Sequence, residues 1–209
     1  MSPLVDVVLF DLGGVLIDFT GVKALRDLTG IASEEELWQR WLTCSWVRRF
    51  ESGACSESAF ADGIVADWKL PLSSAGFLEA FRRWPVGPLP GAEELVVQAK
   101  LAVTVGCASN TNGAHWDSFA AWPLMELFDN RFASFQMGLL KPDAAFFEQI
   151  SGRLALPPDR VLFLDDNMVN VEGAAAAGFR ARRAVGVLQA RECLVEVGVL
   201  PAAARRLHP

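Results

Sequence analysis

Short apolar segments that alternate with stretches of helical spacing constrain the fold of this 209-residue chain more than any other feature. The first segment, residues 6–10, stops at Asp11 and the Gly13-Gly14 pair, as a buried strand does where it enters a turn. Similar runs follow at residues 101–108, 132–135, 161–164 and 179–184. Strands that alternate with helices predict an α/β fold, a doubly wound, Rossmann-like parallel sheet with helices on both faces.

One long stretch interrupts this alternation. Between Asp18 and about Trp84 the strand signals vanish, and the residues, rich in Trp and Phe, have helical spacing, with a capping box at Ser33-x-x-Glu36. Such a stretch is too long for a loop in a compact domain. We therefore expect a core domain of residues 1–17 and 86–209 and an inserted helical domain of residues 18–85.

The charge balance and the cysteines bear on partners and location. With 19 basic against 25 acidic residues the formal net charge is -6, and the clustered Lys and Arg that bind a phosphate backbone are not seen, so we expect no nucleic-acid partner. No basic segment precedes an apolar stretch with a cleavage site, so neither secretion nor membrane insertion is expected. The four cysteines lack C-x-x-C spacing, which favours reduced thiols and a cytoplasmic protein.

Polar residues follow the apolar runs at the points where chemistry is expected. Asp11 ends the first run, Ser109-Asn110 the second and Asp165-Asp166 the fourth, and Lys141 lies shortly after the third. Parallel strands bring these groups to one edge of the sheet, where ligands of such folds bind.

Three carboxylates at one edge repel one another unless a cation neutralises them. Mg²⁺ is the natural candidate, because it prefers oxygen ligands and commonly binds one or two carboxylates together with a substrate phosphate. Lys141 and the hydroxyl and amide of Ser109 would then receive the remaining phosphate oxygens. The pattern predicts a phosphoryl-transfer site.

The same residues resemble the four ordered motifs of the haloacid dehalogenase-like hydrolases, most of which are Mg²⁺-dependent phosphatases with an aspartyl-phosphate intermediate. The matching segments are Phe10-Asp-Leu-Gly-Gly-Val-Leu16, Ser109-Asn110, Lys141-Pro-Asp143 and Leu164-Asp-Asp-Asn167. The resemblance covers the whole chain, since the family's subfamily I places a small helical cap after its first motif.

The resemblance implies a role for each matching residue. Asp11 would be the nucleophile, and Ser109, Asn110 and Lys141 would bind the phosphoryl group. The metal would be held by Asp11, the carbonyl of Gly13, Asp165 and Asp166.

Gly13 is also a departure from the family, which usually has its general acid/base, an Asp, at that position. Asp18 and His115 are the sequence candidates for a substitute, but a solvated helix-cap residue and an exposed helical histidine are their commoner structural roles.

The residues within and around the motifs narrow the class of substrate that is expected. Ser109-Asn-Thr-Asn-x-x-His115 and the segment 165–174 resemble the branch that includes sugar-phosphate phosphatases such as glucose-1-phosphate phosphatase. The resemblance implies a small phosphorylated metabolite as the partner, chosen by a cap turn at Phe50-Glu-Ser-Gly53, in a monomer or homodimer.

Two other functions stay open. A metal-independent 2-haloacid dehalogenase fits the missing Asp at Gly13 but gives no reason to gather three carboxylates. A catalytically weak phosphate-binding or regulatory protein on the same scaffold has Gly13 as its only support.

Overall fold

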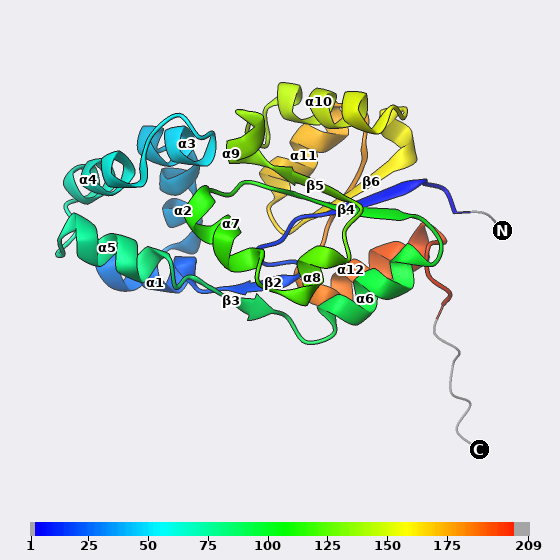
Figure 1. Cartoon of the computed structure of the whole chain (residues 1–209), viewed down its shortest axis with the longest axis horizontal. Helices are drawn as coiled ribbons and strands as arrows, with labels where there is room; N and C mark the ends of the chain where they lie inside the picture. The colour runs from blue at the N-terminus through cyan, green and yellow to red at the C-terminus, as the bar shows by residue number, and fades with distance from the viewer. Residues whose placement is uncertain (1–2, 203–209) are drawn as a thin grey trace, which may run out of the picture.

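The computed structural model describes residues 3–202, and Figure 1 shows a sheet-containing part beside a group of helices along the long axis of the molecule. Five parallel strands form the main sheet in the order β5-β4-β1-β6-β7. They are β1 (Val7–Phe10), β4 (Thr104–Ser109), β5 (Asn130–Ala133), β6 (Val161–Asp165) and β7 (Arg180–Arg183). The doubly wound α/β fold expected from the sequence is therefore confirmed.

The strand sequences match their places in the sheet. Every residue of β1 and β6 is buried, because central parallel strands are covered on both faces. The edge strand β7, Arg-Ala-Arg-Arg, buries only its alanine and exposes its arginines, which discourages pairing with another sheet.

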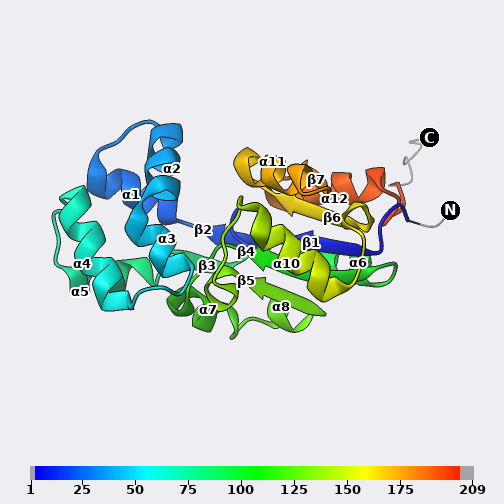
Figure 2. The same cartoon turned by 90° about the horizontal axis from the view of Figure 1, so that it is seen from above.

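Helices cover both faces of the sheet, as Figure 2 shows from above. The helices α6 (Ala92–Lys100), α8 (Pro123–Glu126) and α12 (Gly186–Glu196) share one apolar cluster with β1, and α10 (Ala144–Leu154) and α11 (Met168–Ala176) share another. Two short helices follow the carboxyl ends of strands: α7 (Gly113–Phe119) follows β4 and α9 (Ser134–Met137) follows β5. A 3₁₀ turn, Pro158–Arg160, precedes β6.

Two of the expected strands have shifted bounds. The run at 101–108 begins too early, because Leu101, 86% exposed, belongs to the turn after α6. The run at 132–135 ends too late, because Ser134 starts α9. Apolar character alone does not separate a strand from the turn or helix beside it.

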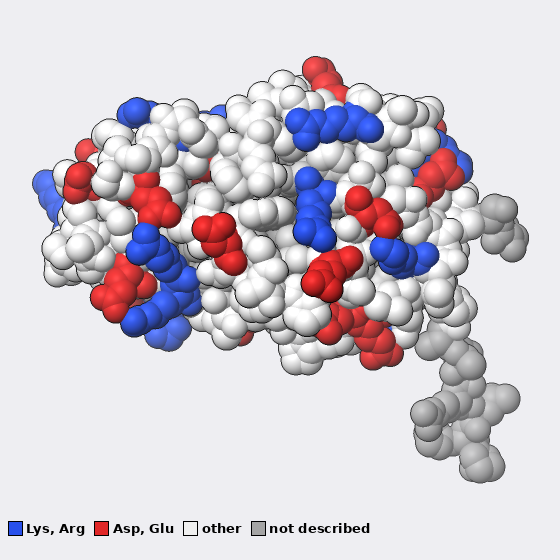
Figure 3. Space-filling view, in the orientation of Figure 1, with Lys and Arg blue, Asp and Glu red and all other residues white. Residues whose placement is uncertain are grey.

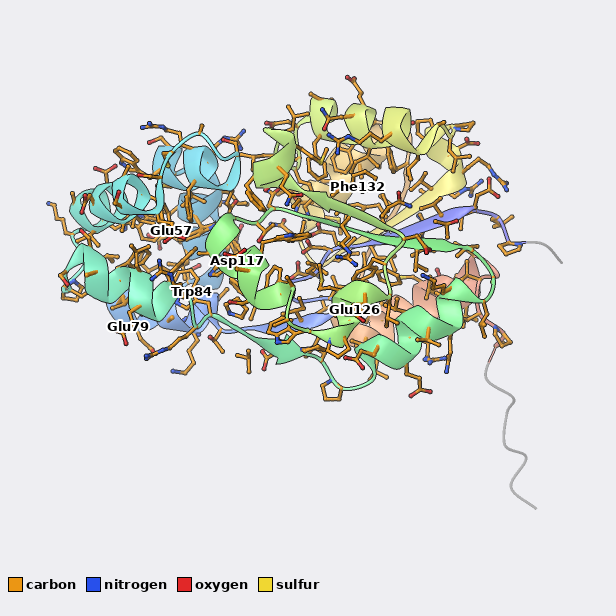
Figure 4. The ribbon with its side chains drawn as sticks, in the orientation of Figure 1. Glu57, Glu79, Trp84, Asp117, Glu126 and Phe132 are labelled. Atoms are coloured by element: carbon orange, nitrogen blue, oxygen red, sulfur yellow. The ribbon has the colours of Figure 1, made fainter. Side chains whose placement is uncertain are left out.

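The second part of the molecule, here called the cap, consists of α1 (Gly21–Thr29), α2 (Glu34–Thr43), α3 (Ser45–Glu51), α4 (Glu57–Trp68) and α5 (Ser74–Phe81). Ser33 caps α2 through its Oγ, which accepts a hydrogen bond from the Glu36 amide at 3.2 Å. The cap has its own aromatic core, in which the Phe50 and Phe60 rings stack with centroids 4.4 Å apart. Figure 4 labels Trp84 at the end of the cap and Phe132 in the sheet.

A two-stranded antiparallel ribbon, which the sequence pattern does not predict, links the cap to the sheet. It pairs β2 (Ile17–Phe19) with β3 (Pro85–Pro88). The segment Pro-Val-Gly-Pro resembles a turn by composition, but each strand of a two-stranded ribbon leaves one edge unpaired, where a proline needs no hydrogen-bond donor. Within residues 3–202, no helix combines the length and the apolar character needed to cross a bilayer.

Phe60→Ala is expected to lower the free energy of unfolding by about 3–5 kcal/mol, because Phe60 is fully buried among the rings of the cap. Urea unfolding followed by tryptophan fluorescence measures the loss. Leu101→Ala, at an exposed site, is the control and should change the value by less than about 0.5 kcal/mol. A loss below about 1 kcal/mol for Phe60→Ala would contradict the packing described for the cap.

Candidate active site

Three carboxylates meet at the carboxyl edge of the sheet. Asp11 follows β1, its amide donates to the Leu164 carbonyl at 2.7 Å, and Asp165 ends the neighbouring strand β6. Asp166 comes next, and one carboxylate oxygen from each of the three lies within 4.8 Å of the others. The parallel register of β1 and β6 therefore produces the acidic cluster that the sequence predicts.

Gly14 lets the chain pass close to this cluster. Its φ of +74° lies in the left-handed region, and a Cβ there would lie 2.2 Å from Oδ2 of Asp166. A side chain at this position would displace the Asp166 carboxylate.

The ammonium of Lys141 lies between two of the carboxylates. Its Nζ donates to Oδ1 of Asp11 at 2.9 Å, to Oδ2 of Asp165 at 2.6 Å and to the carbonyl of Ala108 at 3.0 Å. All three donors of the ammonium are used, and the side chain is almost fully buried. Lys141 thus joins the ends of β1, β4 and β6.

Asn110 fixes the backbone of Lys141. Its Nδ2 donates to the Lys141 carbonyl at 3.0 Å, and its Oδ1 accepts from the Lys141 amide at 2.9 Å. Ser109, the last residue of β4, is buried and lines the same cavity as Asp11. The structure therefore brings together Asp11, Ser109, Asn110, Lys141, Asp165 and Asp166.

Burial and mutual repulsion shift the pKa values of the cluster. Desolvation raises the pKa of Asp11 to about 6, with Lys141 opposing the rise and Asp165 adding to it. Desolvation and the charges of Asp11 and Asp165 raise the pKa of Asp166 to about 7. Burial alone would lower the pKa of Lys141, but the two carboxylates outweigh it and hold that pKa above its ordinary value.

The donor set fits a divalent cation that prefers oxygen. Three carboxylates face one ammonium, which leaves an excess of negative charge in a nearly buried site. The Oδ1 of Asn170 is buried and has no hydrogen-bond partner among the described residues, while its Nδ2 donates to both oxygens of Asp165. Gly13 lines the same cavity and carries a backbone carbonyl. No role is predicted for Asn170 from the sequence. The signal that could have identified it is its place in the first turn of the helix that follows Asp165.

A cavity of about 490 Å³ opens above the cluster, between the sheet edge and the cap. The sheet side contributes Asp11, Ser109, Lys141 and Asp166, and the cap side contributes Trp38, Trp41 and Glu51. A small ligand held there would have its charged end on the sheet and the rest of its atoms against the cap.

The two acid/base candidates from the sequence lie in different surroundings. Asp18 is exposed on β2 and is not among the residues that line the cavity. His115 lines the cavity but is buried, with Nε2 2.8 Å from the Phe81 carbonyl and Nδ1 3.3 Å from Nδ2 of Asn112. Desolvation lowers the pKa of His115 to about 4, so the ring is neutral near pH 7.

Glu51 is the acidic cavity residue on the cap side, and it belongs to the turn Phe50-Glu-Ser-Gly53 that is expected to select the substrate, although no acid/base role is expected for it from the sequence. It ends α3, and desolvation raises the pKa of its carboxyl to about 7. Its neighbours Phe50 and Gly53 mark the turn in the sequence, but no local pattern indicates that the pKa of the carboxyl is raised.

The comparisons with known proteins identify a family through a family model and a shared fold through solved structures. The family model described as haloacid dehalogenase-like hydrolase matches residues 5–178. A HAD family enzyme from Bacteroides thetaiotaomicron, crystallised with magnesium and inorganic phosphate, is 22% identical, with a TM-score of 0.68 over 86% of this chain and 93% of that one. An L-2-haloacid dehalogenase from Xanthobacter autotrophicus, with chloropropionic acid covalently bound, is 21% identical, with a TM-score of 0.63 over 94% and 85%.

Both structures have the same fold as this chain. Among curated proteins, drimenol cyclase drtB from Aspergillus calidoustus is 42% identical over 55 residues, which span 26% of this chain and only 10% of that protein. The family model covers most of the chain and spans the strands that carry Asp11, Ser109 and Asp165, as well as Lys141. The chain therefore belongs to the haloacid dehalogenase-like hydrolase family.

Proposed function

We propose that this hydrolase is a Mg²⁺-dependent phosphatase that cleaves a small phosphate monoester through an aspartyl-phosphate on Asp11. The observation that carries the proposal is the cluster of three carboxylates at the sheet edge, two of which are ion-paired with one buried ammonium. A site that displaces halide from carbon needs one carboxylate nucleophile, whereas a phosphoryl site needs charge to hold the phosphate and its metal.

Four residues would hold the metal: Asp11, Gly13 through its carbonyl, Asp165 and Asp166. Bound Mg²⁺ would offset the charge of the phosphoryl group in the transition state. The unpartnered Oδ1 of Asn170, whose Nδ2 donates to Asp165, supports a bound water or ion beside this set, because a buried amide oxygen without a partner is costly.

The chain's own residues would then position the reaction. Lys141 orients the Asp11 carboxylate through the 2.9 Å contact and offsets charge that develops on the phosphoryl oxygens. The Ser109 hydroxyl would donate to a phosphoryl oxygen. The amide of Asn110, assigned to substrate binding from the sequence, is used on the backbone of Lys141, so we propose that it positions Lys141.

The cavity supports a small substrate, such as a sugar phosphate. Its volume of about 490 Å³ lies in the range typical of small-molecule sites. The face in Figure 3 shows Lys and Arg beside Asp and Glu, and the formal net charge of -6 supports a metabolite as the partner.

A 2-haloacid dehalogenase is the second candidate function. The likeness to the Xanthobacter autotrophicus dehalogenase and the glycine at position 13 favour it. In that reaction Asp11 would attack carbon and release halide, and chelation of metals would have no effect.

Phosphate release tests the proposed function. We expect turnover of p-nitrophenyl phosphate and sugar phosphates with Mg²⁺ and none with chelator, and Asp11→Asn should lower kcat/KM by at least about 1,000-fold. Asp117→Asn, at the exposed position on α7 labelled in Figure 4, is the matched control and should leave activity unchanged. Chelator-resistant halide release from 2-chloropropionate, without phosphate release from any ester, would replace the phosphatase with the dehalogenase.

Unfolding as a function of pH tests the charge balance of the cluster. Asp166 has its folded-state pKa raised from 3.8 to about 7, so its contribution to stability is full below pH 3.8 and is lost as pH rises through 7. Between pH 5 and pH 8, with chelator present, the free energy of unfolding of the wild type should fall on the order of 1–3 kcal/mol more than that of Asp166→Asn. Groups that both proteins share, such as His115, whose lowered pKa has the opposite effect, cancel in this comparison. Mg²⁺ should reduce the extra loss of stability, and equal pH dependences for the two proteins would contradict the raised pKa of Asp166.

A further inference from the structure

The proposed reaction lacks a proton donor at the usual place. An alkyl phosphate releases a basic oxygen, which departs slowly unless an acid protonates it in the transition state. Gly13 has no side chain to supply the proton, and the sheet-side carboxylates Asp11 and Asp166 belong to the nucleophile and the metal site. Among the described residues that line the cavity, the one other acidic side chain is Glu51, on the cap side.

Contacts with the sheet part hold the end of α3, and with it Glu51, over the cavity. The carbonyl oxygen of Glu51 lies 2.6 Å from Oγ of Ser134, and Arg48 pairs with Asp143 at 2.8 Å. Ser134 starts α9, and Asp143 precedes α10 two residues after Lys141. The position of Glu51 is therefore tied to the segment that carries Lys141.

Gly53 makes a third contact with the sheet part. Its φ is +72°, and a Cβ there would lie 2.6 Å from the carbonyl oxygen of Phe135. The turn after Glu51 therefore approaches the backbone of α9 more closely than a side chain allows.

The surroundings of Glu51 favour a carboxyl that holds a proton near neutral pH. Desolvation raises its pKa to about 7, and the hydrogen bond from the Trp41 side chain only partly opposes the rise. Lys141 and Arg48 lower this pKa and Asp11 raises it. The other charged or titratable residues that line the cavity are Lys23, Arg26, His115 and Asp166.

We propose that Glu51 is the general acid that protonates the leaving-group oxygen, a role that rests on the proposed phosphatase function. The Asp11 carboxylate forms a bond to phosphorus as the bond from phosphorus to the leaving oxygen breaks, and that oxygen takes the Glu51 proton. Water then attacks the aspartyl-phosphate, and the Glu51 carboxylate takes a proton from it. The bond between phosphorus and Asp11 breaks, which releases inorganic phosphate and restores both side chains.

The other candidates fit this role less well. Asp18 does not line the cavity, and both ring nitrogens of His115 lie near protein partners. Because the pKa of His115 is lowered to about 4, its ring lacks the second proton at neutral pH and cannot act as the acid.

The test compares Glu51→Gln with the wild type on esters whose leaving groups differ in basicity, with Mg²⁺ present. For glucose 6-phosphate, whose alkoxide needs a proton, kcat/KM should fall by about 100–10,000-fold. For p-nitrophenyl phosphate, whose leaving group departs without one, the fall should be less than about tenfold. We use kcat/KM because it includes departure of the leaving group even when hydrolysis of the aspartyl-phosphate limits kcat.

The pH profile provides a second readout. The kcat/KM of the wild type for the alkyl ester should fall on the basic side as Glu51 loses its proton, and this limb should vanish in Glu51→Gln. Glu51→Asp, which keeps an acid, should recover part of the alkyl-ester activity. Glu79 lies on α5 and forms an exposed ion pair with Arg83, so Glu79→Gln is the matched control and should behave as wild type.

Each other result overturns the role of Glu51. An equal loss on both esters, in a variant with the wild-type melting temperature, would mean that Glu51 positions substrate or the cap, and no loss on either would mean that another group supplies the proton. A wild type that shows no Mg²⁺-dependent turnover of p-nitrophenyl phosphate would reject the phosphatase function itself, and the acid role with it.

Discussion

The buried ammonium of Lys141, held between Asp11 and Asp165, is the interaction on which the rest of the site depends. It joins the ends of three neighbouring strands, because its third donor reaches the carbonyl of Ala108 on β4. A buried ion pair of this kind adds little stability compared with well-packed apolar residues, but removal of one partner leaves an uncompensated charge that costs about 3–5 kcal/mol. The ion pairs of Lys141 with Asp11 and Asp165 are better understood as an arrangement that orients the Asp11 carboxylate and favours its ionised form inside the protein.

Much of this arrangement follows from local sequence. Central parallel strands are buried on both faces, so β1 and β6 stand out as continuous apolar runs, and the polar residues that end them fall at one edge of the sheet. Lys141 could be placed near that edge because it follows the third run. The ribbon of β2 and β3 could not be predicted in the same way, since its pairing joins residues about 70 positions apart and its second strand has the composition of a turn.

Proton transfer is where local sequence loses its predictive power. His115 has a side-chain type suited to acid/base chemistry, but its ring stacks on Phe81 with centroids 4.1 Å apart. Desolvation lowers the pKa of this ring to about 4, so it is neutral near pH 7. Glu51 ends α3 and lines the cavity, where desolvation raises the pKa of its carboxyl to about 7. The pKa of a carboxyl depends on burial and on charges contributed by distant segments, so neighbours in sequence do not reveal it.

Gly13 and Glu51 together suggest a division of labour between the two parts of the molecule. In the proposed phosphatase the sheet edge would supply the nucleophile, the charge that binds phosphate and the ligands for a metal, and the parallel strands bring these groups to one edge. If Glu51 supplies the proton, the acid lies on the cap and is in place only while α3 contacts α9 and Arg48 pairs with Asp143. Attack on an activated ester would then depend on the sheet edge alone, whereas cleavage of an alkyl ester would also require the cap to be closed over the bound substrate. In such an enzyme the position of the cap controls both which leaving group fits and whether that leaving group can depart.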